Sequence, residues 1–126
     1  MTTPTQGIVL FAHGSRDPLW RAPIEAVEAH IRAHHPGVAV RCAYLELTTP
    51  DLPHAVEDLV GQGATAVTIV PMFLGTGKHA REDLPMLVAE LRARHPHVQV
   101  HVQAAIGEDP RMTALMAHIA CTPPAQ

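Results

Sequence analysis

Apolar residues in this chain fall into short unbroken runs that alternate with longer stretches of helical periodicity. The short runs, rich in Val, Ile and Leu, lie near residues 7–12, 38–45, 66–72 and 98–104. The runs at 7–12 and 66–72 lack polar alternation, so they predict strands that are buried on both faces, as in parallel sheets. The chain therefore predicts the element order β-α-β-α-β-α-β-α.

Four other stretches carry apolar residues at spacings of three and four, which is typical of helices that bury one face. The four stripes are Ile24, Val27 and Ile31; Leu52, Val56, Leu59 and Val60; Leu84, Leu87, Val88 and Leu91; and Met112, Leu115, Met116 and Ile119. Thr49-Pro50 and Asp109-Pro110 each pair a capping side chain with a proline. Since proline suits the first helical position, these pairs predict where the second and fourth helices begin.

The chain also repeats itself. The segment IRAHHPGVAV at 31–40 aligns with LRARHPHVQV at 91–100, so the second copy lies 60 residues after the first. Each half predicts one βαβα unit, and right-handed crossovers then give a three-layer α/β/α sandwich around a four-stranded parallel sheet. If the halves diverge from the middle, the first and third strands are central neighbours. Their carboxyl ends would form the crevice in which open α/β sheets bind ligands.

Length and composition narrow the class of protein. A chain of 126 residues suffices for one domain, expected over 1–126 with a core at about 7–120. A net charge of -3 argues against a nucleic-acid surface, and Cys42 and Cys121 form no CxxC pair. The start MTTPTQG carries no targeting pattern, and no window reaches the roughly 18 apolar residues of a membrane span. We therefore expect a cytoplasmic protein with no membrane contact.

Three polar residues follow successive predicted strands. His13 comes after the first, Glu46 after the second and His79 after the third. Because the carboxyl ends of parallel strands share one edge, all three would face one rim. Two imidazoles and a carboxylate are a common set for a divalent first-row metal ion. From spacing alone, a second interpretation stays open, in which these residues only cap and solvate loops.

The loops that carry the two histidines contain further candidates. In HGSRDP, Ser15 or Asp17 would cap the first helix, so Ser15 has a structural interpretation beside a ligand-binding one. Arg16, Lys78 and Arg81 share the two loops. On a chain of negative net charge, this local basic group predicts an anionic ligand near the rim.

Two phosphate-binding motifs are incomplete. GTGKHA at 75–80 fits G-x-G-x-x-A, but no acidic residue follows about 20 positions on, as the dinucleotide fingerprint requires. A P-loop is excluded because Met72 stands where its first glycine belongs. His13-Gly14 is similar to part of the Arg-His-Gly phosphatase motif, but Ala12 stands in place of the arginine. A histidine-dependent phosphate hydrolase stays an alternative.

Three segments together resemble a known family. They are AHGSRDP at 12–18, YLELTTPDL at 44–52 and VPMFLGTGKHAREDLP at 70–85. They are similar to the short-form sirohydrochlorin chelatases, which belong to the class II tetrapyrrole metal chelatases. The resemblance implies a chelatase-like (flavodoxin-like) fold and the insertion of a divalent metal into sirohydrochlorin or a related tetrapyrrole, in cobalamin or sirohaem biosynthesis. Co²⁺ is the first candidate, with Fe²⁺ and Ni²⁺ beside it, and no organic cofactor is implied.

The resemblance also assigns residues. His13 matches the catalytic histidine after the first strand, and His79 matches the histidine of the G-x-H loop. Glu46 matches the metal-contacting glutamate, with Pro50 four residues later. These three are the candidate catalytic and metal-binding residues. Candidates for contacts with the substrate, chosen by position, are Ser15, Arg16, Lys78 and Arg81.

The length of the chain bears on its assembly. Longer members of the family carry two such domains with the pocket between them, whereas this chain supplies one. A symmetric homodimer enclosing the tetrapyrrole is therefore expected. A non-catalytic metal or tetrapyrrole carrier on the same fold is the main alternative.

Overall fold

A parallel sheet of four strands, in the order β2-β1-β3-β4, forms the centre of the computed structural model, which describes residues 5–123. The strands are β1 (Thr5–Ala12), β2 (Ala39–Tyr44), β3 (Ala64–Pro71) and β4 (Gln99–Val102). The helices are α1 (Pro18–His34), α2 (Leu52–Gly61), α3 (Lys78–Arg94) and α4 (Pro110–Cys121), with a short 3-10 turn η1 (Ile106–Glu108) before α4. The ends of the expected 1–126 domain, including the first four residues of MTTPTQG, lie outside the described residues.

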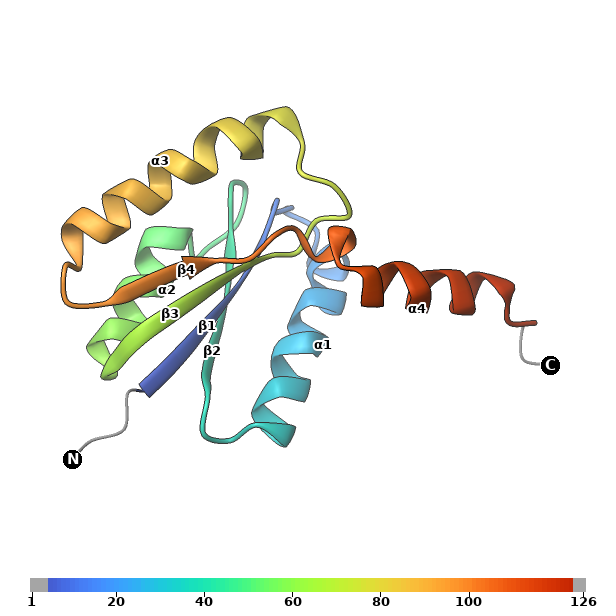
Figure 1. Ribbon diagram of the computed structural model, residues 1–126, viewed down its shortest axis with the longest axis horizontal. Helices are drawn as coiled ribbons and strands as arrows, with labels where there is room; N and C mark the ends of the chain where they lie inside the picture. Colours follow the sequence, from blue (N-terminus) through green and yellow to red (C-terminus); the bar gives the residue numbers. More distant parts are fainter. Residues whose placement is uncertain (1–4, 124–126) are drawn as a thin grey trace.

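Helices flank the sheet on both faces, with α1 on one face and α2 and α3 on the other (Figure 1). The predicted α/β architecture is confirmed, and β1 and β3 are the central neighbours, as the repeat predicted. None of the helices within residues 5–123 is long and apolar enough to cross a membrane.

The main core lies between the sheet and the α2 and α3 helices. Phe11, Leu59 and Ile69 are fully buried there, and Leu91 of α3 joins them. Burying one side chain of this size stabilises the fold by about 1.5–3 kcal/mol. On the other face a smaller cluster packs against α1, and no residue of α1 itself is fully buried. One face of the sheet is therefore closed more tightly than the other.

The internal repeat is visible in the structure. The guanidinium of Arg32 donates to the carbonyl of Val40 at 3.3 Å, and that of Arg92 donates to the carbonyl of Val100 at 2.8 Å. Each bond joins the last turn of a helix to the strand that follows it. Because α1 and α3 lie on opposite faces, the two halves are related by an approximate two-fold axis along the strands.

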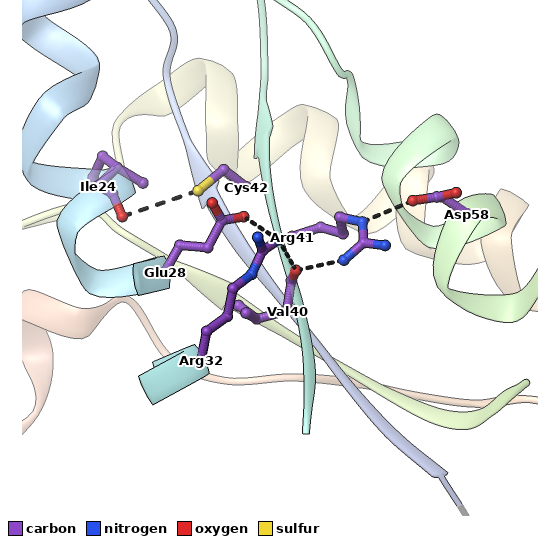
Figure 2. Close-up of polar contacts among 7 residues, drawn as sticks. All are labelled: Ile24, Glu28, Arg32, Val40, Arg41, Cys42 and Asp58. Atoms are coloured by element: carbon purple, nitrogen blue, oxygen red, sulfur yellow. Dashed lines mark hydrogen bonds and ion pairs between the residues drawn. The ribbon is translucent and has the colours of Figure 1, made fainter. Parts of the chain in front are cut away.

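The edge strand β2 is held to the helices on both of its sides (Figure 2). Arg41 Nε pairs with Asp58 of α2 at 2.7 Å, and the Cys42 thiol donates to the carbonyl of Ile24 of α1 at 3.9 Å. Burial, together with the charge of nearby Glu28, raises the pKa of Cys42 to about 12. The thiol is therefore a packing group in its neutral form, and β2 enters the next loop from a fixed position.

The second helix begins two residues later than the Thr49-Pro50 pair predicted, so that prediction is wrong. The helix starts at Leu52, and Asp51 is its cap, with a carboxylate oxygen accepting from the His54 N–H at 3.0 Å. The carbonyl of Pro50 accepts from the Tyr44 N–H at 2.9 Å. Since this bond ties Pro50 to the end of β2, the residue is not available to open the helix.

The fourth helix begins as predicted but lies away from the sheet. Pro110 is its first residue, and Asp109 caps it by accepting from the Arg111 N–H at 2.8 Å. The apolar stripe predicted a buried face, yet no residue of α4 is buried. Leu115 and Ile119 are 49% and 62% exposed, and Figure 1 shows the helix extending outward from the body of the fold.

Candidate active site

Loops that follow β1, β2 and β3 border one cavity of about 360 Å³ at the carboxyl edge of the sheet. Its polar lining consists of His13, Glu46, Lys78, His79 and Asp83. The structure thus brings together the three residues that the sequence set after successive strands. The remaining lining is apolar or glycine.

The first two loops are fastened to each other by their backbones. The Leu45 N–H donates to the Ala12 carbonyl at 2.9 Å, and the Glu46 N–H donates to the His13 carbonyl at 3.0 Å. Gly14 follows with φ +106°, and a Cβ atom there would lie 1.8 Å from the carbonyl oxygen of Glu46. Only glycine fits this position, because both the backbone angle and the close approach exclude a side chain.

His13 rests on an aromatic side chain of the core. Its ring stacks on Phe73 with a centroid distance of 4.3 Å and an interplanar angle of 30°. Phe73 is 4% exposed and meets Phe11 edge-on at 6.0 Å. The stacking fixes the plane of the imidazole, while the residue stays exposed toward the cavity.

His79 belongs to the first turn of α3. The cap residue Gly77 offers no side-chain hydrogen bond, and the first turn contains Lys78 and no acidic residue. The backbone N–H groups and the helix dipole favour an anion at such an end. Arg81 donates to the Thr76 carbonyl at 3.3 Å and lines a neighbouring apolar groove of about 530 Å³ between α3 and β4, so it is absent from the lining of the cavity itself.

Ser15 and Arg16, like Arg81, lie outside the lining of this cavity. The Ser15 hydroxyl accepts from the Asp17 N–H at 3.0 Å, and Asp17 caps α1 by accepting from Leu19 N–H at 2.9 Å. Of the two candidate caps, Asp17 is therefore the one that caps α1, and Ser15 accepts a hydrogen bond in the turn before it. Arg16, in the same loop, is exposed.

Asp83 is the cavity residue that sequence reasoning missed. It stands four residues after His79 on α3, so both side chains occupy one face of the helix. The spacing His-x-x-x-Asp was the available signal, because residues four apart at the start of a helix lie on one face of it.

The polar lining does not form a closed metal cage. Within residues 5–123, no three or more His, Cys, Asp or Glu side chains are close enough together to hold a metal ion. His13, Glu46 and His79 therefore share a cavity without converging on one point. Such a site can supply separate ligands and proton acceptors to a bound molecule.

The sequence of the chain matches a known protein family over most of its length. The CbiX family pattern matches residues 7–121, which include the whole cavity. The chain belongs to the CbiX family. The family resemblance inferred from the motifs is thereby confirmed.

Relatives of this CbiX chain carry chelatase names. It is 34% identical to the sirohydrochlorin cobaltochelatase of Methanococcoides burtonii over 82 residues, which are 65% of this chain and 63% of that protein. It is 30% identical to the sirohydrochlorin ferrochelatase of Bacillus subtilis over 113 residues, which are 90% of this chain and 43% of that protein. The chain thus spans less than two thirds of either relative.

One solved structure matches this chain over nearly the full length of both proteins. A CbiX protein of Marinobacter aquaeolei VT8, assigned to cobalamin (vitamin B12) biosynthesis, is 33% identical to this chain. The superposition covers 91% of this chain and 93% of that one, with a TM-score of 0.78. The predicted chelatase-like fold is therefore confirmed.

Proposed function

We propose that this chain inserts a divalent metal ion into sirohydrochlorin or a closely related tetrapyrrole. The observation that carries the proposal is the cavity shared by His13, Glu46 and His79 at the carboxyl edge of the sheet. Relatives with both cobaltochelatase and ferrochelatase names support this reaction class. Co²⁺ is the first candidate ion, and Fe²⁺ and Ni²⁺ suit the same donor atoms.

The reaction exchanges two pyrrole N–H protons for one divalent ion, so the site must accept two protons for each metal ion delivered. Imidazole is suited to this task because it changes charge near neutral pH. We assign proton acceptance and transient metal binding to His13 and His79. The ring of His13, stacked on Phe73, would approach the macrocycle in a fixed plane.

Delivery of the ion requires ligands that release it. The cavity offers imidazole and carboxylate groups and no thiolate, and its acidic and histidine side chains form no three-ligand cage within the described residues. An ion held by Glu46 and one histidine would keep open positions for the pyrrole nitrogens. Glu46 would also offset the charge of the incoming ion.

The substrate is a polyanion, and basic groups border the cavity on one side. Lys78 lines the cavity, and the uncapped N-terminus of α3 lies beside it. We assign the substrate's carboxylates first to Lys78 and these backbone N–H groups, through charge-assisted hydrogen bonds. Arg81 in the adjoining groove, and Ser15 and Arg16 in the first loop, are the outer candidates.

One chain leaves the substrate partly uncovered. A cavity of about 360 Å³ falls at the low end of the roughly 300–1,000 Å³ that accommodates drug-sized ligands, and a tetrapyrrole is larger than these. We therefore propose a homodimer in which a second copy closes the site. The free cysteines Cys42 and Cys121 agree with a reducing cytoplasm.

The test is a metallation assay with Co²⁺, Ni²⁺ and Fe²⁺ under anaerobic conditions, followed by the absorption spectrum of the tetrapyrrole. His13→Ala and His79→Ala should abolish metal insertion, and Glu46→Gln should slow it. His97→Ala, which changes an exposed histidine just before β4 at the opposite edge of the sheet, is the matched control and should leave the rate unchanged.

Unchanged rates in both histidine variants would overturn the assignment. Tight binding of metal or tetrapyrrole by the parent protein, with no metallation by any ion, would favour the carrier alternative. Turnover of phosphomonoesters that depends on His13 would favour the hydrolase.

A further inference from the structure

Two histidines near the end of α1 stack on each other. His30 and His34 are four residues apart in the helix, and both are exposed. Their rings have a centroid distance of 4.0 Å and an interplanar angle of 20°. Residues four apart occupy one face of a helix, and a His-x-x-x-His pair on one face can bind a metal ion through two imidazoles. We call these two residues the histidine pair.

A hydrogen bond to the backbone fixes how one of the rings presents its nitrogens. The Nδ1 atom of His34 lies 3.0 Å from the carbonyl oxygen of His30. Because a carbonyl oxygen only accepts, Nδ1 is the donor, and the lone pair of the neutral ring is on Nε2. Metal-binding histidines have this arrangement, in which one ring nitrogen donates to a carbonyl and the other binds the ion. In its neutral form, His34 is therefore oriented as a metal ligand.

The two rings are close enough to share one ion. Metal–imidazole bonds are about 2.0–2.1 Å long, so two nitrogens on the same ion lie about 3 Å apart. Rings whose centroids are 4.0 Å apart reach this spacing through small rotations of the exposed side chains. Water would complete the coordination, because within residues 5–123 no group of three or more His, Cys, Asp or Glu side chains could hold an ion.

The basic side chain between the two histidines is engaged elsewhere. Arg32 pairs with Glu28 at 3.4 Å and donates to the carbonyl of Val40 at 3.3 Å (Figure 2). Both contacts direct its guanidinium toward β2. The positive charge of Arg32 is therefore held away from the face that carries the histidine pair.

The internal repeat indicates that the fold does not require histidine at these positions. Adding 60 to each position gives Glu90 and Arg94 in α3, which are also exposed. The two helices nevertheless end in the same way. In each, the residue after the last helical one donates its N–H to the carbonyl four residues earlier, at 2.7 Å for His35 and 2.9 Å for His95. The helix end thus gives no structural reason for a pair of histidines.

The histidine pair lies far from the candidate active site. α1 begins at Pro18, just after the carboxyl edge of the sheet, and runs toward the opposite edge (Figure 1). With a rise of about 1.5 Å per residue, His30 lies about 18 Å along the helix from Pro18. An ion on the pair is therefore out of reach of His13, Glu46 and His79.

We propose that the histidine pair is a second metal site, which binds one divalent ion of the series Co²⁺, Ni²⁺, Cu²⁺ and Zn²⁺ through two imidazoles and water. Imidazole suits these ions, whereas Mg²⁺ and Ca²⁺ prefer oxygen ligands. With two protein ligands in an exposed position, the ion exchanges readily with solution. The site goes beyond the proposed metal insertion and does not depend on it.

The test uses a protein that carries His13→Ala and His79→Ala, so that the second site is measured alone. Substoichiometric Ni²⁺, which is paramagnetic, should broaden the imidazole proton signals of His30 and His34 first in NMR spectra. His30→Ala or His34→Ala should weaken Ni²⁺ binding about 100-fold in calorimetry, because the second imidazole acts at a high effective concentration. His35→Ala, which changes the next exposed histidine, is the matched control and should leave the affinity unchanged.

A double variant, His30→Glu with His34→Arg, places the residues of α3 at the same positions of α1. It should keep the circular dichroism and the urea unfolding curve of its parent while losing the Ni²⁺ site. Mg²⁺ should bind neither protein at the pair. Equal Ni²⁺ affinity before and after His34→Ala would overturn the proposal. So would earlier broadening of other histidine signals, or a loss of affinity in His35→Ala as large as that in His34→Ala.

The metallation assay separates this site from the proposed function. In the otherwise unchanged protein, His34→Ala should insert metal at the parent rate when the ion is saturating, and loss of insertion would overturn the independence of the two sites. Ni²⁺ binding at the pair without metal insertion argues against the proposed function and leaves the second site standing. Metal insertion without Ni²⁺ binding at the pair argues against the second site and leaves the proposed function standing.

Discussion

Replacing Gly14 by alanine should destabilise the protein and open the candidate active site. At φ +106° a side chain strains the backbone by about 1–2 kcal/mol. The new Cβ atom would also lie 1.8 Å from the Glu46 carbonyl oxygen, so one of the two loops must move. Movement would break the bond from the Glu46 N–H to the His13 carbonyl, worth about 1 kcal/mol. The free energy of unfolding should therefore fall by about 2–3 kcal/mol.

Two other glycine positions allow the cost of backbone strain to be measured separately from the cost of close contact. Gly63 has φ +102° with open space around its Cβ position, so Gly63→Ala should cost only the strain, about 1–2 kcal/mol. Gly107→Ala tests close contact without a positive φ, because its Cβ atom would lie 2.1 Å from the Leu74 carbonyl oxygen. Urea unfolding, with an unchanged slope, gives the three free energies. Equal losses for Gly14→Ala and Gly63→Ala would refute the argument from loop contact, as would a Gly14→Ala variant with full metallation activity.

Three further predictions address packing, reactivity and pH. Leu59→Ala should lower the free energy of unfolding by about 2–5 kcal/mol, measured in urea, because the side chain is fully buried. A maleimide at pH 8 should label the exposed thiol of Cys121 at once and that of Cys42 only on unfolding, since burial raises the pKa of Cys42 to about 12. Rapid labelling of both thiols in the folded protein would contradict this. Burial raises the pKa of Asp51, but hydrogen bonds from His54 outweigh it and leave the pKa below its usual value. The cap therefore stabilises the fold above about pH 4 and loses its effect as the pH falls further. Asp51→Ala should lower the free energy of unfolding by about 1 kcal/mol at pH 7 and by almost nothing near pH 2. A difference in unfolding free energy between parent and variant that stays constant across this range would contradict the prediction.

The sequence predicted the two central strands because β1 and β3 are nearly continuous apolar runs, which is typical of strands buried on both faces. It predicted His13, Glu46 and His79 as neighbours because parallel strands end at a common edge. The predicted start of α2 was wrong because the carbonyl of Pro50 accepts a hydrogen bond from the Tyr44 N–H. Capping rules consider only neighbouring residues and do not include such a contact with the preceding strand.

The outward position of α4 could not be predicted for a related reason. An apolar stripe predicts that a helix will be covered, but it does not say by which molecule. The contact that turns the chain outward involves Gly107 and the loop after β3, which are more than 30 residues apart in the sequence.

Phe73 connects the candidate active site with the turn before α4. Its ring supports the imidazole of His13, and its carbonyl accepts the hydrogen bond from Gly107 that holds the turn before α4. A substitution that displaces this turn, such as Gly107→Ala, should therefore also disturb the imidazole of His13, because both contacts depend on the position of one residue.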